Sequence, residues 1–211
     1  MPEAERGLRL FVACELPEDV REALGRMQDE LRKLDAGALR FARPDGIHVT
    51  LKFLGNVEEA RVSEITAALG AAIEPFALHL RPATLGGFPA ASPGAGDGAR
   101  LRVVWVGLEG DVDALGALAR RVEAALAPLE FPAERRPFAP HLTLARVRDT
   151  ASARERRTLS EVVGGYGVPP MPSMMLTSVV LMRSVLGAGG SAYHRLASFP
   201  KTAGGELDGL G

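Results

Sequence analysis

The sequence predicts an α+β fold of two duplicated lobes, each an antiparallel-rich sheet covered by outer helices, related by a pseudo-two-fold axis around a central cleft. One observation is that strand-like and helix-like hydrophobic patterns alternate along the 211 residues. The other is an internal repeat. A shift of 93 residues, the separation of His48 and His141, aligns RLFVACEL with RVVWVGLE and HVTL with HLTL.

The first half of the chain predicts five elements. Residues 8–16 are a short apolar run typical of a buried strand, and residues 18–34 carry apolar side chains at three-and-four spacing, which predicts an amphipathic helix. Residues 47–54 alternate like a strand. A second helix is expected over 62–73 and a further strand over 76–85.

The glycine-rich segment 86–99 predicts a flexible surface loop that separates the halves. It lacks the Lys and Ser/Thr of a P-loop, which argues against a phosphate cradle there. The second half then repeats the pattern. Its expected elements are a strand over 101–107, a helix over 112–126, a strand over 141–146, a helix over 151–163 and closing strands over 174–186 and 193–199.

Neither half is long enough to hold a cleft by itself, so we expect a single bilobal domain over residues 1–200 and a flexible tail over 201–211.

The charges nearly cancel, with 25 Lys and Arg against 26 Asp and Glu, which leaves no chain-wide basic field for a long polyanion. The single cysteine, Cys14, excludes a disulfide framework, and we expect an inert core thiol. The first residues resemble neither a signal peptide nor a membrane anchor, so we expect a cytoplasmic protein without membrane association.

The duplicated His-x-Thr motif is the strongest functional signal. Side chains alternate along a strand, so His48 and Thr50 share one face, as do His141 and Thr143, and the two pairs can meet across the cleft. Two imidazoles can act as general acid and general base, while the threonine hydroxyls hydrogen-bond the non-bridging oxygens of a phosphoryl group. We therefore expect in-line displacement at phosphorus without a metal or another cofactor. The alternative of a two-histidine metal site lacks a third ligand at a suggestive spacing.

Two neighbouring positions are candidate substrate contacts. Arg146 could hold a ribose-phosphate anion, and Phe53, its partner at offset 93, could stack on a base. Strict alternation puts both on the face opposite the histidines, so a ligand role requires the strand to twist or bulge near its end. Alternation puts Lys52 on the histidine face, where it either adds charge to the cleft or is solvated.

These residues resemble a known family, the bacterial RNA 2',3'-cyclic phosphodiesterases, also called the 2'-5' RNA ligase family, within the 2H phosphoesterase superfamily. The resemblance covers nearly the whole chain except the tail. It is carried by RLFVACELP at Arg9, HVTLKFLG at His48, FPAASP at Phe88, VVWVGL at Val103, PFAPHLTLARV at Pro137 and an ending with Ser184, Tyr193 and Phe199.

The resemblance implies hydrolysis of an RNA or nucleoside 2',3'-cyclic phosphate to the 2'-phosphate, with His48 as proton donor and His141 as the acceptor that activates water. The sequence alone does not make this assignment, because the motifs are near-equivalent and close imidazoles titrate as a coupled pair. The same proton transfers in reverse, with an RNA 5'-hydroxyl, would form a 2'-5' linkage.

Other functions stay open at this point. The expected partners are RNA ends or nucleotides that carry the cyclic phosphate, with no obligate protein partner and a monomeric state. The alternatives are an RNA-end binding module without turnover, and a phosphodiesterase for another cyclic phosphate, such as ADP-ribose cyclic phosphate or a 2'-5' oligonucleotide.

Overall fold

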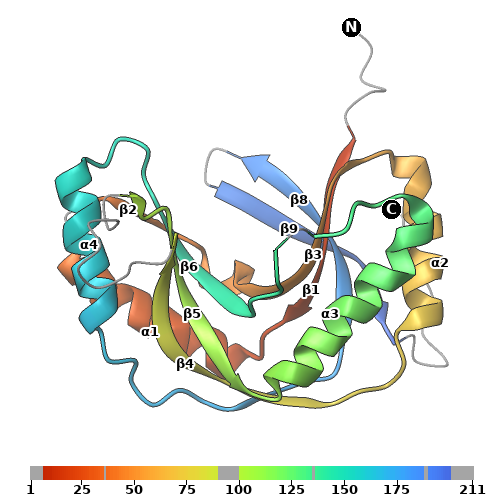
Figure 1. Ribbon diagram of the computed structural model, residues 1–211, viewed down its shortest axis with the longest axis horizontal. Helices are drawn as coiled ribbons and strands as arrows, with labels where there is room; N and C mark the ends of the chain where they lie inside the picture. The colour runs from red at the N-terminus through yellow and green to blue at the C-terminus, as the bar shows by residue number, and fades with distance from the viewer. Residues whose placement is uncertain (1–6, 36, 90–99, 135, 188–189, 201–211) are drawn as a thin grey trace, which may run out of the picture.

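The protein folds as a curled antiparallel sheet with helices on its outer face (Figure 1). The structure, a computed structural model, describes residues 7–35, 37–89, 100–134, 136–187 and 190–200. The predicted tail, 201–211, and most of the predicted loop, 90–99, lie outside the described residues.

The elements follow one another in the predicted order, which confirms the α+β class. The strands are β1 (Leu8–Glu15), β2 (Leu39–Phe41), β3 (His48–Val57), β4 (Leu78–Phe88), β5 (Val103–Gly110), β6 (His141–Val147), β7 (Met174–Leu176), β8 (Val179–Gly187) and β9 (Gly190–Phe199). The helices are α1 (Glu18–Leu34), α2 (Val62–Ala72), α3 (Val112–Leu126) and α4 (Ala153–Gly165). Short 3-10 turns lie over Pro44–Gly46, Glu59–Arg61 and Ala127–Leu129.

Three sequence expectations change in detail. The short strand β2 was not predicted, and the expected strand over 174–186 is divided into β7 and β8. The expected loop begins later, because Gly86 and Gly87 belong to β4. Glycine is needed there, since a Cβ at Gly86 would overlap the Trp105 ring and one at Gly87 would overlap Leu101.

The two repeats exchange strands. The nine-stranded sheet has the order β7-β4-β5-β6-β3-β1-β8-β9, with β2 beside β6. Strand β4, from the first repeat, pairs with β5 of the second, and β8, from the second repeat, pairs with β1 of the first. Each side of the sheet is therefore built from both halves of the sequence. The repeats meet at the centre, where β3 and β6 pair at Val49 and Leu142.

The helices cover the convex face in pairs. Helices α2 and α3 lie together on one side of the sheet, and α1 and α4 on the other (Figure 1). The Tyr166 hydroxyl, just after α4, donates to the Glu30 carboxylate of α1 at 2.8 Å. Among the described helices, none is long and apolar enough to span a bilayer.

The core lies between this convex face and the helices. Helix α1 contributes one apolar stripe to it, consisting of Val20, Leu24, Met27 and Leu31. Burial raises the pKa of the Cys14 thiol in β1 to about 12, as expected for the inert core thiol that the sequence predicts. A smaller apolar cluster lies on the opposite, concave face of the sheet. It consists of Phe11, Ala13, Val180 and Met182.

Candidate active site

The four residues of the paired motif lie at the centre of the sheet, on its concave face. Val49 is opposite Leu142, so in this antiparallel register His48 is level with Thr143, and Thr50 is level with His141. All four side chains are partly exposed, whereas Val49 and Leu142 are fully buried on the helix side. The fold thus brings both His-x-Thr pairs together, each as the first residues of its strand.

Both imidazoles are held in the same way. His48 Nδ1 lies 2.8 Å from the Gly46 carbonyl oxygen, and His141 Nδ1 lies 2.7 Å from that of Ala139. A carbonyl only accepts, so Nδ1 carries the proton in each neutral ring and Nε2 carries the free lone pair. Each acceptor lies two residues before its histidine, which means that the repeat has preserved the support as well as the imidazole.

Aromatic rings fix the orientation of both imidazoles. The Phe11 ring stacks on His48 with a centroid separation of 4.7 Å and an interplanar angle of 25°, and Tyr193 meets it edge-on at 5.2 Å. His141 has an equivalent edge-on neighbour in Phe88, at 5.0 Å. These aromatic contacts were not predicted from the sequence, because each ring comes from a strand that the topology, not the chain order, brings beside the motif.

The surroundings of His48 shift its pKa downward. Burial is the largest cause, because the protonated ring loses solvation. The hydrogen bond to Gly46 acts in the opposite direction, and the nearby charge of His141 lowers the pKa further. This last effect reflects the short separation of the two rings in the cleft.

A β-bulge in each central strand changes the faces that strict alternation predicts. Thr143 and Ala145 are opposite successive residues of β5, so Leu144 is an extra residue. Leu51 is an extra residue of β3 in the same way, since Thr50 and Lys52 are opposite successive residues of β1. The two bulges lie at the same place in the repeat, 93 residues apart.

These bulges correct the expectation for Lys52 and resolve that for Phe53. Lys52 is buried on the helix side, where its Nζ donates to the Glu123 carboxylate of α3 and to the Pro132 carbonyl oxygen, both at 2.8 Å. Phe53 lies on the histidine face, with its ring 6.3 Å from that of Phe11 and 63% of the residue exposed. The extra residue Leu51 thus places Lys52 on the helix side and Phe53 on the histidine side, the reverse of what strict alternation predicts.

Arg146 also lies on the concave face, by two observations. Its neighbours Ala145 and Val147 are buried in a cluster with Leu159 of α4, whereas Arg146 is exposed. It is also directly opposite Arg40 of β2, another exposed residue. Arg146 therefore faces the cleft, although strict alternation assigns it to the helix side.

Gln28 of α1 holds the bulge of β6 from behind. Its side chain is fully buried, and Nε2 donates to the Leu144 carbonyl oxygen at 3.0 Å and to that of Ala42 at 2.9 Å. The sequence offered one sign of this role, a glutamine within the apolar stripe of α1, but the residue was not among the predicted site residues.

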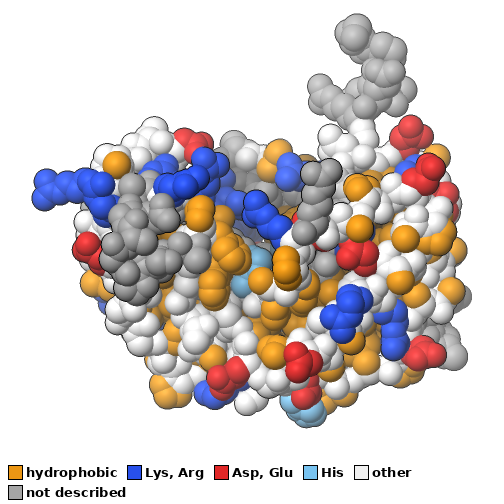
Figure 2. All heavy atoms as spheres, viewed as in Figure 1, with side chains coloured by type: hydrophobic (Ala, Val, Ile, Leu, Met, Phe, Trp, Pro, Cys, Tyr) orange, Lys and Arg blue, Asp and Glu red, His pale blue; other side chains and the backbone are white. Residues whose placement is uncertain are grey.

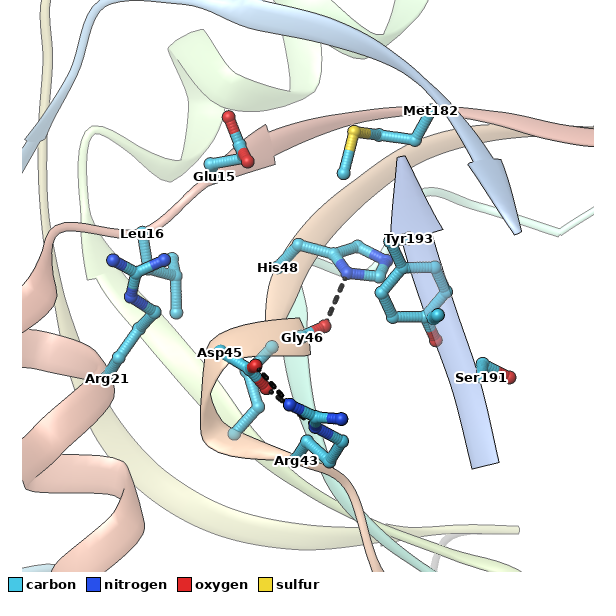
Figure 3. Close-up of a pocket in the computed structure, with 12 residues that line it drawn as sticks. Glu15, Leu16, Arg21, Arg43, Asp45, Gly46, His48, Met182, Ser191 and Tyr193 are labelled. Carbon is cyan, nitrogen blue, oxygen red and sulfur yellow. Dashed lines mark hydrogen bonds and ion pairs between the residues drawn. The ribbon is translucent and has the colours of Figure 1, made fainter. Parts of the chain in front are cut away.

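A pocket of about 280 Å³ opens beside His48 (Figure 3). Its wall includes Gly46, Tyr193 and Arg43, and the Arg43 guanidinium donates to the Asp45 carboxylate at 2.8 Å. Figure 2 shows the concave face as a hollow with histidine at its base and basic side chains on its rim. Within the described part of the chain, no group of three His, Cys, Asp or Glu side chains is placed to hold a metal ion.

The other two histidines lie away from this site. His79 is exposed in β4, as the sequence predicts, and its backbone N–H donates to the Asp111 carboxylate at 2.8 Å. His194, which the sequence left undecided, is exposed in β9 opposite Arg183.

Comparison with known proteins gives consistent matches over most of the chain. Residues 16–187 match the family model of the 2'-5' RNA ligase superfamily. A Methanothermobacter thermautotrophicus protein named RNA 2',3'-cyclic phosphodiesterase is 32% identical over 91% of this chain and 98% of its own length. An Escherichia coli protein of the same name is 31% identical over 69% of this chain and 74% of its own length.

Solved structures give the same result for the fold. The Escherichia coli LigT structure in complex with 3'-AMP superposes with a TM-score of 0.69 at 26% identity, covering 92% of this chain and 97% of LigT. A protein from Thermus thermophilus superposes with a TM-score of 0.68 at 28% identity, covering 90% of this chain and 96% of its own.

Proposed function

The chain belongs to the 2'-5' RNA ligase superfamily, and from this premise we propose that it hydrolyses RNA or nucleoside 2',3'-cyclic phosphates to 2'-phosphates by paired-histidine acid–base catalysis. Membership confirms the resemblance that the sequence motifs indicate. The curated relatives above carry the name RNA 2',3'-cyclic phosphodiesterase, which supports a hydrolase that acts on phosphodiesters.

The observation that carries the proposal is the matched support of the two imidazoles. Each Nδ1 is engaged by a backbone carbonyl two residues before it, so each Nε2 is free to exchange a proton. Binding alone needs no proton acceptor and donor, so this arrangement favours catalysis over an RNA-end binding module.

In the proposed reaction, His141 Nε2 takes a proton from water as the water oxygen attacks phosphorus. The bond from phosphorus to the 3' oxygen breaks, and His48, which enters the reaction as an imidazolium protonated on both ring nitrogens, gives its Nε2 proton to that oxygen. The products are a 2'-phosphomonoester and a free 3'-hydroxyl. Thr50 and Thr143 donate to the non-bridging oxygens, which carry the charge of the transition state.

The two candidate substrate contacts, Arg146 and Phe53, extend this site on the same face. Arg146 binds a phosphate oxygen of the substrate, and Phe53 offers an exposed ring on which a base can stack. Reversal of the two proton transfers with an RNA 5'-hydroxyl as nucleophile would give 2'-5' ligation. A monomer acting in the cytoplasm, without a metal, stays the prediction from the sequence.

The test is turnover of a panel of cyclic phosphates in EDTA. The panel contains nucleoside 2',3'-cyclic phosphates, RNA ending in a cyclic phosphate, ADP-ribose cyclic phosphate and a 2'-5' oligonucleotide. We expect 2'-phosphate products, a bell-shaped pH profile, and losses on the order of 10²- to 10⁴-fold in kcat for His48→Ala and His141→Ala.

His194→Ala is the matched control, because it removes an exposed imidazole outside the cleft. It is expected to keep full activity. Undiminished turnover in either motif variant, or loss of activity in chelator, would contradict the proposal. Turnover only of ADP-ribose cyclic phosphate or of a 2'-5' oligonucleotide would keep the mechanism and change the substrate.

A further inference from the structure

Four arginines line a second pocket, of about 430 Å³, beside the candidate active site. The pocket lies where β2, the start of β5 and the end of β6 come together. Its charged lining consists of Arg40, Arg102, Arg146, Arg148 and Asp149. Four guanidinium groups thus share this pocket with a single carboxylate.

The sheet register brings these cations together. Arg40 and Arg146 are directly opposite each other in the β2–β6 pair, and Val103, the residue after Arg102, is opposite Arg146 in the β5–β6 pair. Arg40 points away from the helices, because its neighbour Phe41 packs beneath the Arg32 guanidinium of α1, 4.6 Å from the ring centroid. The arginines of β2 and β6 therefore share the concave face with the histidines.

This arrangement is electrostatically unfavourable in the free protein. Like charges directly opposite in an antiparallel pair are destabilising. In the described part of the chain, none of the four arginines forms an ion pair, although Arg148 Nε donates to the Gly37 carbonyl oxygen at 3.0 Å. Surface arginines elsewhere, such as Arg43 and Arg195, have carboxylate partners. An anionic ligand would relieve the repulsion and satisfy the guanidinium donors.

The pocket lies on the side of the site where the proposed leaving group departs. Thr143 is level with His48. Arg146 lies three residues further along β6 than Thr143, a distance of roughly 10 Å at ~3.3 Å per strand residue. In-line displacement separates the attacking water from the leaving oxygen. With His48 as acid, the ribose that carries the 3' oxygen lies toward this pocket, and an RNA chain continues from that ribose in the 5' direction.

We propose that Arg40, Arg102, Arg146 and Arg148 form a subsite that binds the phosphodiester groups immediately 5' of the terminal cyclic phosphate, so that an RNA end is hydrolysed in preference to a free nucleotide. This inference rests on the proposed function and adds the residues that distinguish the two kinds of substrate. Phosphates that follow one another at ~3.4 Å of rise in a stacked strand can reach the pocket within a few nucleotides of the histidines.

The test compares a cyclic mononucleotide with a tetranucleotide that ends in a 2',3'-cyclic phosphate. In the double variant R40Q/R102Q, we expect kcat/KM for the tetranucleotide to fall about tenfold or more, with the mononucleotide unchanged. The slope of log kcat/KM against log salt concentration for the tetranucleotide should become shallower by about 1.4, or about 0.7 per lost phosphate contact.

R154Q/R157Q is the matched control, because it removes two positive charges from exposed positions of α4 outside the pocket. It should leave both substrates unaffected. A tetranucleotide-to-mononucleotide ratio that stays the same in R40Q/R102Q, or falls equally in the control, would overturn the inference. Failure of the wild type to hydrolyse either substrate would instead overturn the proposed function.

A measurement on the unmodified protein keeps the inference testable if the double variant does not fold. The salt dependence of kcat/KM should be steeper for the tetranucleotide than for the mononucleotide, because only the longer substrate has phosphates for the arginine pocket. Equal slopes for the two substrates would overturn the inference without any substitution.

Discussion

Replacing Gln28 by methionine tests whether the bulge of β6 depends on support from α1. Methionine has a similar length and no hydrogen-bond donor, so the change removes the bonds to the Leu144 and Ala42 carbonyl oxygens without opening a large cavity. At about 1 kcal/mol for each net hydrogen bond, we expect a loss of about 2 kcal/mol in the free energy of unfolding. For a chain of this size that is a fall of roughly 4–8 °C in Tm.

The activity assay makes this prediction specific. The bulge at Leu144 determines that Arg146 faces the cleft, so Gln28→Met should also raise KM for an RNA end that carries a 2',3'-cyclic phosphate while the native fold is still populated. Gln28→Glu is the informative companion. A carboxylate cannot donate to two carbonyls, and its burial adds a desolvation cost, so this variant should be less stable than Gln28→Met.

Urea unfolding and steady-state kinetics measure the two effects. A free energy of unfolding within about 0.5 kcal/mol of the wild type, together with an unchanged KM, would contradict this prediction. It would mean that the Ala42 carbonyl finds another donor and that the Ala42 N–H, which donates to the Leu144 carbonyl at 2.8 Å, is sufficient there. A loss of stability with an unchanged KM would mean that Gln28 stabilises the fold but does not determine the orientation of Arg146.

Three further predictions follow from the surroundings of single residues. The pKa of His48, read by NMR titration, should lie below about 6.5 and should rise, but stay below that value, in His141→Ala, because burial remains the larger cause. Between this folded pKa and about pH 6.5 the unfolded chain binds more protons at His48 than the folded chain does. The contribution of His48 to stability is therefore present above about pH 6.5 and is lost as the pH falls through its folded pKa. A pKa at or above about 6.5 for His48 in the folded protein would contradict this. Phe53→Ala should raise KM by roughly 5- to 100-fold if a base stacks there, with stability unchanged because the ring is exposed, while Phe53→Tyr retains affinity. Cys14, with a pKa of about 12, should resist alkylation at pH 8 until urea unfolds the chain, as mass spectrometry can show; rapid labelling of the native protein would argue against burial of the thiol.

The sequence predicts the centre of the site well, because the repeat supplies two independent copies of one pattern. His48 and His141 could be paired, and placed on one face with their threonines, from alternation and the 93-residue shift alone. The helices could be predicted equally well, since the apolar spacing over residues 18–34 coincides with α1.

What the sequence could not predict depends on geometry that no local pattern encodes. Alternation fails beyond Leu51 and Leu144, because a bulge adds one residue on one strand only. The faces of Lys52 and Phe53 are therefore exchanged relative to the simple prediction. The arginine pocket was missed for a related reason: Arg40 lies on a three-residue strand too short to show any periodicity.

The exchange of strands between the repeats interlocks the two halves of the chain. A cut between Phe88 and Val103 would leave β4 in a fragment that holds neither of its neighbours, since β5 and β7 both come from the other half. It would likewise leave β8 without β1. Such fragments would each expose unpaired strand edges, and they could rebuild the cleft only by assembling with one another.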